Sequence, residues 1–239
     1  MGQFRQRVGG KDRKREGRKL TRGLATVMWS TIVVLIAIVV IFAGMRVAGD
    51  APFIATGLPA ERGSFEERYV AQPWLAYLHI APGVLYLVGA PLQLSRRFRT
   101  RHFVFHRRFG RVLISLGIVS GVFALAFGVP FAYGGAWQSL AAAVFGSWFL
   151  VALLLAFRAI RRRDVRMHRR WMIRAFAVGL GVGTIRIWVG LFALFDIASL
   201  QASFGPAFWL GLSMHVAAAE AWLWWRPNQN GRPRSAASR

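Results

Sequence analysis

Long apolar stretches alternate with shorter polar segments along this chain. Six of the stretches run for about 20 residues or more, the length that an α-helix needs to cross about 30 Å of hydrocarbon. The polar segments between them are short, or they carry charges in blocks. The pattern therefore predicts an all-α fold, an integral membrane bundle of six transmembrane helices. The spans are expected near residues 24–47, 73–94, 108–131, 137–160, 171–195 and 204–225.

The positive charges predict how this bundle is oriented. All but four of the 32 Lys and Arg lie in the N-terminal segment, in two loops with their adjoining helix ends, or after the last span. With six spans, these four regions fall on one side of the membrane. The opposite side carries most of the acidic residues, mainly in the loop 50–71. Because cytoplasmic loops carry the excess of Lys and Arg, both termini are expected to be cytoplasmic.

The chain divides into three parts. Residues 1–23 are polar and basic, and they predict a disordered cytoplasmic tail near the bilayer surface. Residues 24–225 form the six-helix transmembrane domain, and residues 226–239 form a second polar, basic cytoplasmic tail. The first apolar run is longer than the 7–15 residues typical of a signal-peptide core, which favours an uncleaved span. This first span has few polar residues and is expected to pack outside the other five.

The net charge of +23 has two interpretations. In a soluble protein it would suggest nucleic-acid binding. Here the basic residues flank apolar spans, which favours contacts with anionic lipid head groups at the cytoplasmic face and no nucleic-acid partner. Two His-Arg-Arg triplets at the starts of spans carry the arginines expected to contact phosphates, Arg107, Arg108, Arg169 and Arg170.

Several kinds of chemistry lack their sequence signals. The chain has no cysteine, so it has no disulfide, thiolate nucleophile or Cys-ligated metal. It has no HExxH zinc motif and no Gly-rich phosphate-binding loop. No catalytic residue is assigned, and the sequence decides neither for nor against an enzyme.

A few polar residues are expected at membrane depth, where they are costly and are candidates for function. His79, Arg186 and His215 lie within spans, and His106 and His168 lie at the cytoplasmic ends of two spans. At 100° per residue, His79 and Arg186 each share a helix face with glycines, and so do His106 and His168. These faces are therefore expected to point into the bundle, where small residues allow close approach of a helix or of a flat ligand.

Haem ligation is one hypothesis for these residues. A b-type haem in a membrane bundle needs imidazoles on facing helices at similar depth. At 1.5 Å per residue, His79 lies about 9 Å and His215 about 15 Å from the outer ends of their spans. They are the predicted first pair of metal ligands, and His106 and His168 the possible second pair. Arg186 would then meet a haem propionate or an outer-loop carboxylate, and the protein would act in membrane electron transfer.

The alternative hypothesis is a non-redox membrane protein. Glycine faces also occur as ordinary seams between helices, and histidines at membrane surfaces often hydrogen-bond across helices. In that case the protein is a transporter, or a scaffold that binds lipids or proteins. Arg186 would then bind a substrate anion or have a structural role. The sequence names no substrate, redox partner or protein partner.

A set of motifs carries a resemblance to a known family. They run from His79-Ile80-x-x-Gly83 and Gly89-x-Pro91-x-Gln93, through His106-Arg107 with Gly110-Arg111, to Trp148, Arg158, Arg161, Asp164, His168-Arg169-x-Trp171-Met172-Ile173-Arg174 and Arg186. Through them the chain resembles the domain-of-unknown-function family 2306, uncharacterised bacterial membrane proteins, over residues 72–225. The resemblance implies a multi-pass helical protein of the bacterial cytoplasmic (inner) membrane, and it implies no activity.

Overall fold

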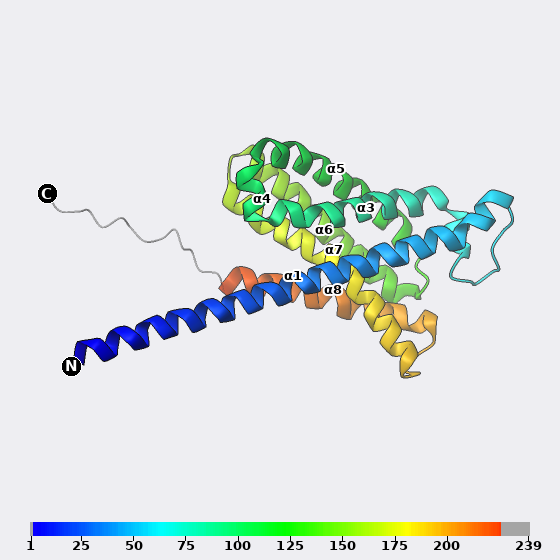
Figure 1. Cartoon of the computed structure of the whole chain (residues 1–239). Helices are drawn as coiled ribbons and strands as arrows, with labels where there is room; N and C mark the ends of the chain where they lie inside the picture. Colours follow the sequence, from blue (N-terminus) through cyan, green and yellow to red (C-terminus); the bar gives the residue numbers. More distant parts are fainter. Residues whose placement is uncertain (1, 226–239) are drawn as a thin grey trace.

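The computed structural model describes residues 2–225, with side chains from residue 23 onward. Every regular element in this range is a helix. Long antiparallel helices form a bundle, and α1 runs across one face of it (Figure 1). The helices are α1 (Gly2–Thr56), α2 (Glu67–Ala71), α3 (Pro73–Leu94), α4 (Arg96–Arg101), α5 (Phe103–Gly128), α6 (Gly135–Arg161), α7 (Val165–Leu194) and α8 (Leu200–Trp225).

Five of these helices are long and apolar enough to cross a membrane by length and composition: residues 23–56 of α1, and all of α3, α5, α6 and α7. The prediction of an all-α membrane bundle is confirmed at this level. The predicted sixth span coincides with α8, which is 26 residues long and therefore long enough. α8 is not among the five that meet both conditions, and it carries His215, Glu220 and Pro206.

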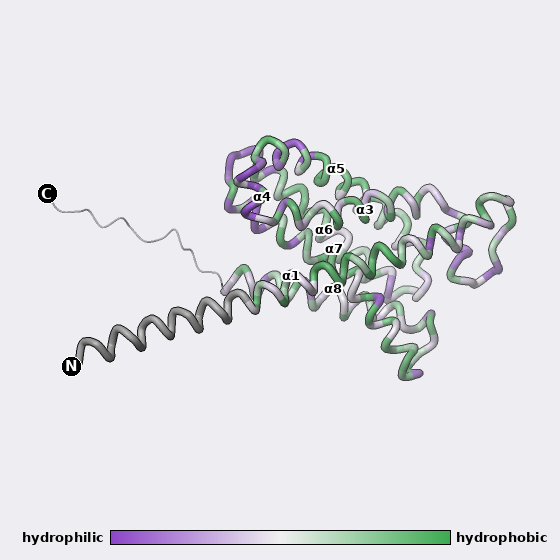
Figure 2. Tube along the Cα trace, in the orientation of Figure 1, coloured by the Kyte–Doolittle hydropathy of each residue, from purple (hydrophilic) through white to green (hydrophobic). Residues whose placement is uncertain are grey.

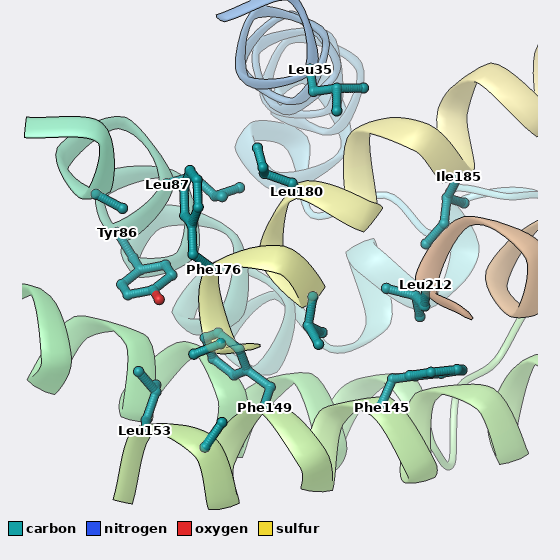
Figure 3. Packing of buried hydrophobic residues seen from close by; sticks show 14 of the residues in the cluster. Leu35, Tyr86, Leu87, Phe145, Phe149, Leu153, Phe176, Leu180, Ile185 and Leu212 are labelled. Atoms are coloured by element: carbon teal, nitrogen blue, oxygen red, sulfur yellow. The ribbon is translucent and has the colours of Figure 1, made fainter. Parts of the chain in front are cut away.

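The core lies where α3, α6 and α7 meet. Figure 3 shows Tyr86 and Leu87 of α3 beside Phe176 and Leu180 of α7, with Phe149 of α6 below them. The helix pairs α3–α5, α5–α6, α6–α7 and α7–α8 each pack side by side, and α8 also contacts α6. The bundle is therefore closed around α7, which touches α1, α3, α6 and α8.

The first helix lies at the edge of the bundle, as its sequence predicts, but it is seated by one close backbone contact. From residue 23 onward most of α1 is exposed, whereas Leu35 is buried. It packs against α7 at Gly183, where an added Cβ would lie 2.7 Å from the carbonyl oxygen of Leu35. Only a residue without a side chain allows α1 and α7 to approach this closely.

The two ends of the bundle differ in polarity (Figure 2). We call the basic end the one that carries residues 96–108 and 158–170, where α4 and the α6–α7 loop lie together. The opposite end, which we call the α2 end, carries the loop 57–66 and α2. The bodies of the helices between the two ends are mainly apolar.

The predicted and observed helix boundaries agree best where a particular residue in the sequence marks the end of the helix. The second predicted span matches α3 at both ends, and its start is marked by Pro73 at the first helical position. In contrast, α5 and α7 begin five or six residues before the predicted spans. The residues just before the predicted starts, 103–107 and 165–170, are already helical. For α7, Asp164 accepts a hydrogen bond from the backbone of Met167 and caps the helix there (2.9 Å).

The division into two tails and a membrane domain stays a prediction. The first tail overlaps the first 22 residues of α1, and residues 226–239 lie outside the described residues.

Candidate ligand-binding site

A cavity of about 470 Å³ lies inside the bundle, reaching toward the α2 end. This volume falls in the range of small-molecule sites, about 300–1,000 Å³. Its walls come from α1, α2 with the segment before it, α3, α5, α6, α7 and α8, and they are mainly apolar and aromatic. The polar side chains that line it are Arg46, Glu66, Arg68, Tyr69, His79, Tyr86, Ser120, Gln138 and Arg186.

Glycines on three helices shape this cavity. Gly83 of α3 faces Ser120, and an added Cβ would lie 2.7 Å from the Ser120 hydroxyl oxygen. Gly121 of α5 and Gly179 of α7 also line the cavity, each against the side chain of a neighbouring helix. The prediction that the glycine faces point into the bundle is therefore confirmed at these positions. It is wrong at Gly190, where nothing lies within 4 Å of an added Cβ.

Arg46 of α1 is neutralised by two carboxylates. Its side chain is only 10% exposed, and it forms ion pairs with Asp50, one helical turn further on, and with Glu66 (3.3 Å). Asp50 is fully buried and also accepts a hydrogen bond from the Tyr77 hydroxyl (2.8 Å). These contacts join α1, α3 and the segment before α2. Burial of the Asp50 carboxylate is feasible because both of its oxygens have donors.

Arg68 of α2 is held by aromatic rings instead of an acid. Its guanidinium carbon lies 4.4 Å from the Phe65 ring centre and 5.0 Å from that of Tyr69, a cation–π arrangement. Its Nη1 donates to the backbone oxygen of Phe131 (3.3 Å), while its Nε is buried without an acceptor. Burial lowers the pKa of Arg68 below its ordinary value, and the nearby charges of Arg186 and Arg46 lower it further.

Arg186 of α7 lacks an acid partner. Its guanidinium carbon lies 5.5 Å from the centre of the Phe42 ring of α1, a cation–π contact. Among residues 23–225 it forms no ion pair or hydrogen bond. The sequence suggested an outer-loop carboxylate as its partner, but Glu66, the loop carboxylate that lines the cavity, is paired with Arg46 instead. Since a buried cation without an anion is costly, this residue marks the site.

His79 lines the cavity in a fixed orientation. Its Nδ1 lies 3.0 Å from the backbone oxygen of Ser120, and the Ser120 hydroxyl donates to the backbone oxygen of His79 (2.8 Å). A carbonyl at Nδ1 places the proton there, which leaves Nε2 as an acceptor or metal ligand. No residue from 23 to 225 hydrogen-bonds to that Nε2.

His215, the predicted partner of His79, has different neighbours. Its Nε2 lies 2.7 Å from the hydroxyl of Thr184 on α7. It does not line the cavity, although Leu212, one turn earlier on α8, does. The structure therefore does not bring His79 and His215 onto one cavity.

The two remaining candidate histidines meet at the basic end. His168 donates a hydrogen bond from Nδ1 to the backbone oxygen of Ala156 (3.0 Å). His106 lies within electrostatic range of His168, and its Nδ1 is buried without a partner. The side-chain nitrogen of Gln93 is also buried without a partner, and the Gln93 oxygen lies against Gly110, one turn after His106.

The four arginines predicted to contact phosphates also lie at the basic end. None of Arg107, Arg108, Arg169 and Arg170 pairs with a carboxylate within the described part of the chain. The same end holds an ion pair that sequence reasoning missed. Arg174 of α7 binds Glu220 of α8 through two hydrogen bonds (2.5 and 2.7 Å). Residues 174 and 220 are on different helices, so no spacing rule connects them.

Sequence reasoning also missed Arg46 and Arg68 as site residues, because it counted them only as charges of the outer side. The available signal was that few Lys or Arg lie away from the basic segments. Among residues 23–225, no three His, Asp or Glu side chains lie close enough together to hold a metal ion. The metal ligation predicted for His79 and His215 stays a prediction.

These features define a polytopic helical membrane protein with a cationic, mainly apolar cavity inside its bundle. Residues 76–225 match the family model described as "Predicted membrane protein (DUF2306)", and the chain belongs to this family. The match covers α3 from its fourth residue to the end of α8. No curated protein and no solved structure matches the chain.

Proposed function

We propose that this protein binds an anionic, largely apolar ligand in the cavity, as a membrane transporter or a lipid-binding scaffold does. The observation that carries the proposal is Arg186, a cation on the cavity wall without an anion among residues 23–225. Ligand pockets combine apolar walls with a few polar groups that fix orientation, and this cavity has that composition. A bound anion would supply the missing partner of Arg186.

The membrane arrangement that we propose has six spans, with α8 as the sixth. Its length suffices, and it packs along α7 and α6 over its whole course. Six spans also put every basic segment on one side, which favours cytoplasmic termini in a multi-pass protein of the bacterial cytoplasmic membrane. The basic end would then face anionic lipids, and the α2 end would face outward.

Single cysteines test this arrangement, since the natural chain has none. Arg62→Cys at the α2 end should react with a membrane-impermeant maleimide added outside intact cells. Arg163→Cys at the basic end and Ser238→Cys after α8 should react only after the cells are opened. If Ser238→Cys reacts from outside while Arg163→Cys does not, α8 is not a span.

A photoreactive fatty acid tests the ligand site. The purified protein, in nanodiscs of zwitterionic lipid, is irradiated with a diazirine derivative of dodecanoate, and the labelled residues are identified by mass spectrometry. Labelling should fall on cavity residues such as Gly179 and Phe149, and Arg186→Gln should reduce it. Arg158→Gln, an exposed arginine of α6 away from the cavity, is the control. Equal labelling of both variants would overturn the proposal.

Binding of b-type haem for electron transfer is a second candidate, favoured by the orientation of His79. A haem-ligating histidine commonly donates from Nδ1 to a carbonyl and offers Nε2 to the iron, and His79 has that arrangement toward Ser120. The guanidinium groups of Arg186 and Arg68 lie where haem propionates would find cations. His106 and His168 would form the second pair, and a second ligand for the first haem would require His215 to leave Thr184.

Visible absorption spectra test whether the protein binds haem. The protein is purified in mild detergent from cells supplied with a haem precursor, and spectra are recorded before and after reduction with dithionite. Haem binding at His79 predicts a Soret band that is weaker in His79→Ala and unchanged in the exposed control His102→Ala. A colourless wild-type protein, or a Soret band unchanged by His79→Ala, would refute the role of His79.

A further inference from the structure

The charges around the cavity specify how many charges its ligand carries. We infer that the ligand is a monoanionic amphiphile, with one acidic group at Arg186 and an apolar chain directed toward the middle of the bundle. This inference rests on the proposed function and adds the class of the ligand to it. It is drawn from the charge balance and from the direction of the cavity.

The charge balance leaves one positive charge. Three guanidinium groups line the cavity, and two carboxylates, Glu66 on its wall and Asp50 behind it, balance two of them. Both carboxylates are bound to Arg46, so neither is free to turn toward Arg186. Arg68 and Arg186 also lie close enough to act on each other electrostatically. One added negative charge would make the site neutral, while two would leave an excess anion in a medium of low polarity.

The direction of the cavity distinguishes an amphiphile from a small anion. All three arginines lie toward the α2 end, since Arg68 is in α2 itself and Arg46 and Arg186 are in the last third of α1 and α7. From Arg186 to Gly179 the cavity follows α7 for seven residues, about 10 Å at 1.5 Å per residue. Beyond the arginines the walls are mainly apolar, with Phe145, Phe149 and Leu212 among them. A small inorganic anion would leave this apolar part unfilled, whereas a hydrocarbon chain would bury its surface there.

The same count predicts how two substitutions change ligand preference. Arg186→Gln removes the unbalanced charge, so a neutral amphiphile should bind as well as an anionic one. Glu66→Gln adds one positive charge, so a dianionic head group should become the better ligand. Glu66 is 37% exposed in its side chain, so its neutral isostere tests charge with little effect on packing. Arg158→Gln is again the control.

The experiment is a competition against the photoreactive dodecanoate described above, in zwitterionic nanodiscs at a pH that ionises every acid used. The competitors share one chain and differ in charge: dodecanol, dodecanoate and dodecyl phosphate. For the wild type and Arg158→Gln, dodecanoate should compete at about tenfold lower concentration than either of the others, a difference of about 1.4 kcal/mol. Arg186→Gln should abolish the difference between dodecanoate and dodecanol. Glu66→Gln should make dodecyl phosphate the strongest competitor.

Each outcome bears on one of the two claims. If the wild type is not labelled in the cavity, the proposed function fails, and the inference about charge fails with it. If the wild type is labelled but dodecanol or dodecyl phosphate competes as well as dodecanoate, only the inference fails. Monodisperse gel filtration and an unchanged melting temperature are required of each variant. If Arg186→Gln does not meet them, Glu66→Gln alone decides through the predicted change in preference.

Discussion

The contact between α1 and α7 gives the most quantitative prediction. In Gly183→Ala, the new methyl group would lie 2.7 Å from the backbone oxygen of Leu35, where ordinary contacts begin near 3.4 Å. The obstacle is backbone, which no change of side-chain rotamer can remove, so α1 must retreat by roughly 0.7 Å. Overpacking of this kind typically costs about 1–3 kcal/mol. We expect the free energy of unfolding to fall by that amount relative to a matched control.

The control is Gly190→Ala, the same substitution two turns later on α7. Nothing lies within 4 Å of an added Cβ there. Both variants gain the same helix propensity, about 1 kcal/mol for Gly to Ala, so their difference isolates the contact with α1. Unfolding by dodecyl sulfate in mixed micelles, followed by tryptophan fluorescence, measures both. If Gly183→Ala is as stable as Gly190→Ala, α1 is not seated on α7 as described.

Three further predictions concern the basic end. Asp164→Ala should lower the free energy of unfolding by about 1 kcal/mol because α7 loses its N-cap, while Asp164→Asn keeps the cap and should match the wild type; equal values for the two variants would contradict this. Glu220→Gln should lower the free energy of unfolding by about 1–2 kcal/mol in the same dodecyl sulfate titration. This lies between the values for exposed and buried ion pairs, because the side chain of Arg174 is 13% exposed and that of Glu220 is 44% exposed. An unchanged unfolding midpoint would contradict this prediction. Replacing Arg169 and Arg170 by Glu should abolish the dependence of the melting temperature on anionic lipid in nanodiscs, and an unchanged dependence would exclude them as lipid contacts.

The sequence predicts most of the helical framework because each membrane helix must satisfy its own backbone locally. The span at α3 is predicted at both ends, since Pro73 marks its start and a basic segment follows its end. The starts of α5 and α7 are missed because the helix continues into polar residues that lie beyond the apolar run. Hydropathy locates the part of a helix that lies in hydrocarbon, and capping residues such as Asp164 locate where the helix begins.

The pairing of histidines could not be predicted from depth. The sequence predicts that His79 and His215 lie about 9 Å and 15 Å from the same side of the membrane, but depth does not fix the rotation of a helix about its axis. The Nε2 of His215 is hydrogen-bonded to the hydroxyl of Thr184 on α7. The Nδ1 of His79 is hydrogen-bonded to the backbone oxygen of Ser120 on α5. The glycine faces predict the rotation of α3 better, because Gly83 and His79 lie one turn apart and both contact Ser120.

The convergence of three arginines could not be predicted either, because they belong to three helices. Arg46 and Arg186 are 140 positions apart in the sequence. Their proximity depends on how α1 packs against α7, where Gly183 faces the backbone of Leu35. Composition alone records only that few basic residues lie away from the basic segments.

The segment that matches the family model contributes only part of the cavity lining. Arg186 and His79 lie within residues 76–225, whereas Arg46, Glu66 and Arg68 lie before them. The unbalanced cation therefore belongs to the matched segment, and the groups that cover it come from α1, α2 and the loop between them. Since α1 forms one wall of the cavity, a displacement of α1 opens that wall to lipid. Gly183→Ala should for this reason change ligand labelling and lower the stability relative to Gly190→Ala, and Gly190→Ala should leave the labelling unchanged. A loss of stability in Gly183→Ala with labelling unchanged would show that α1 supports the bundle without closing the cavity.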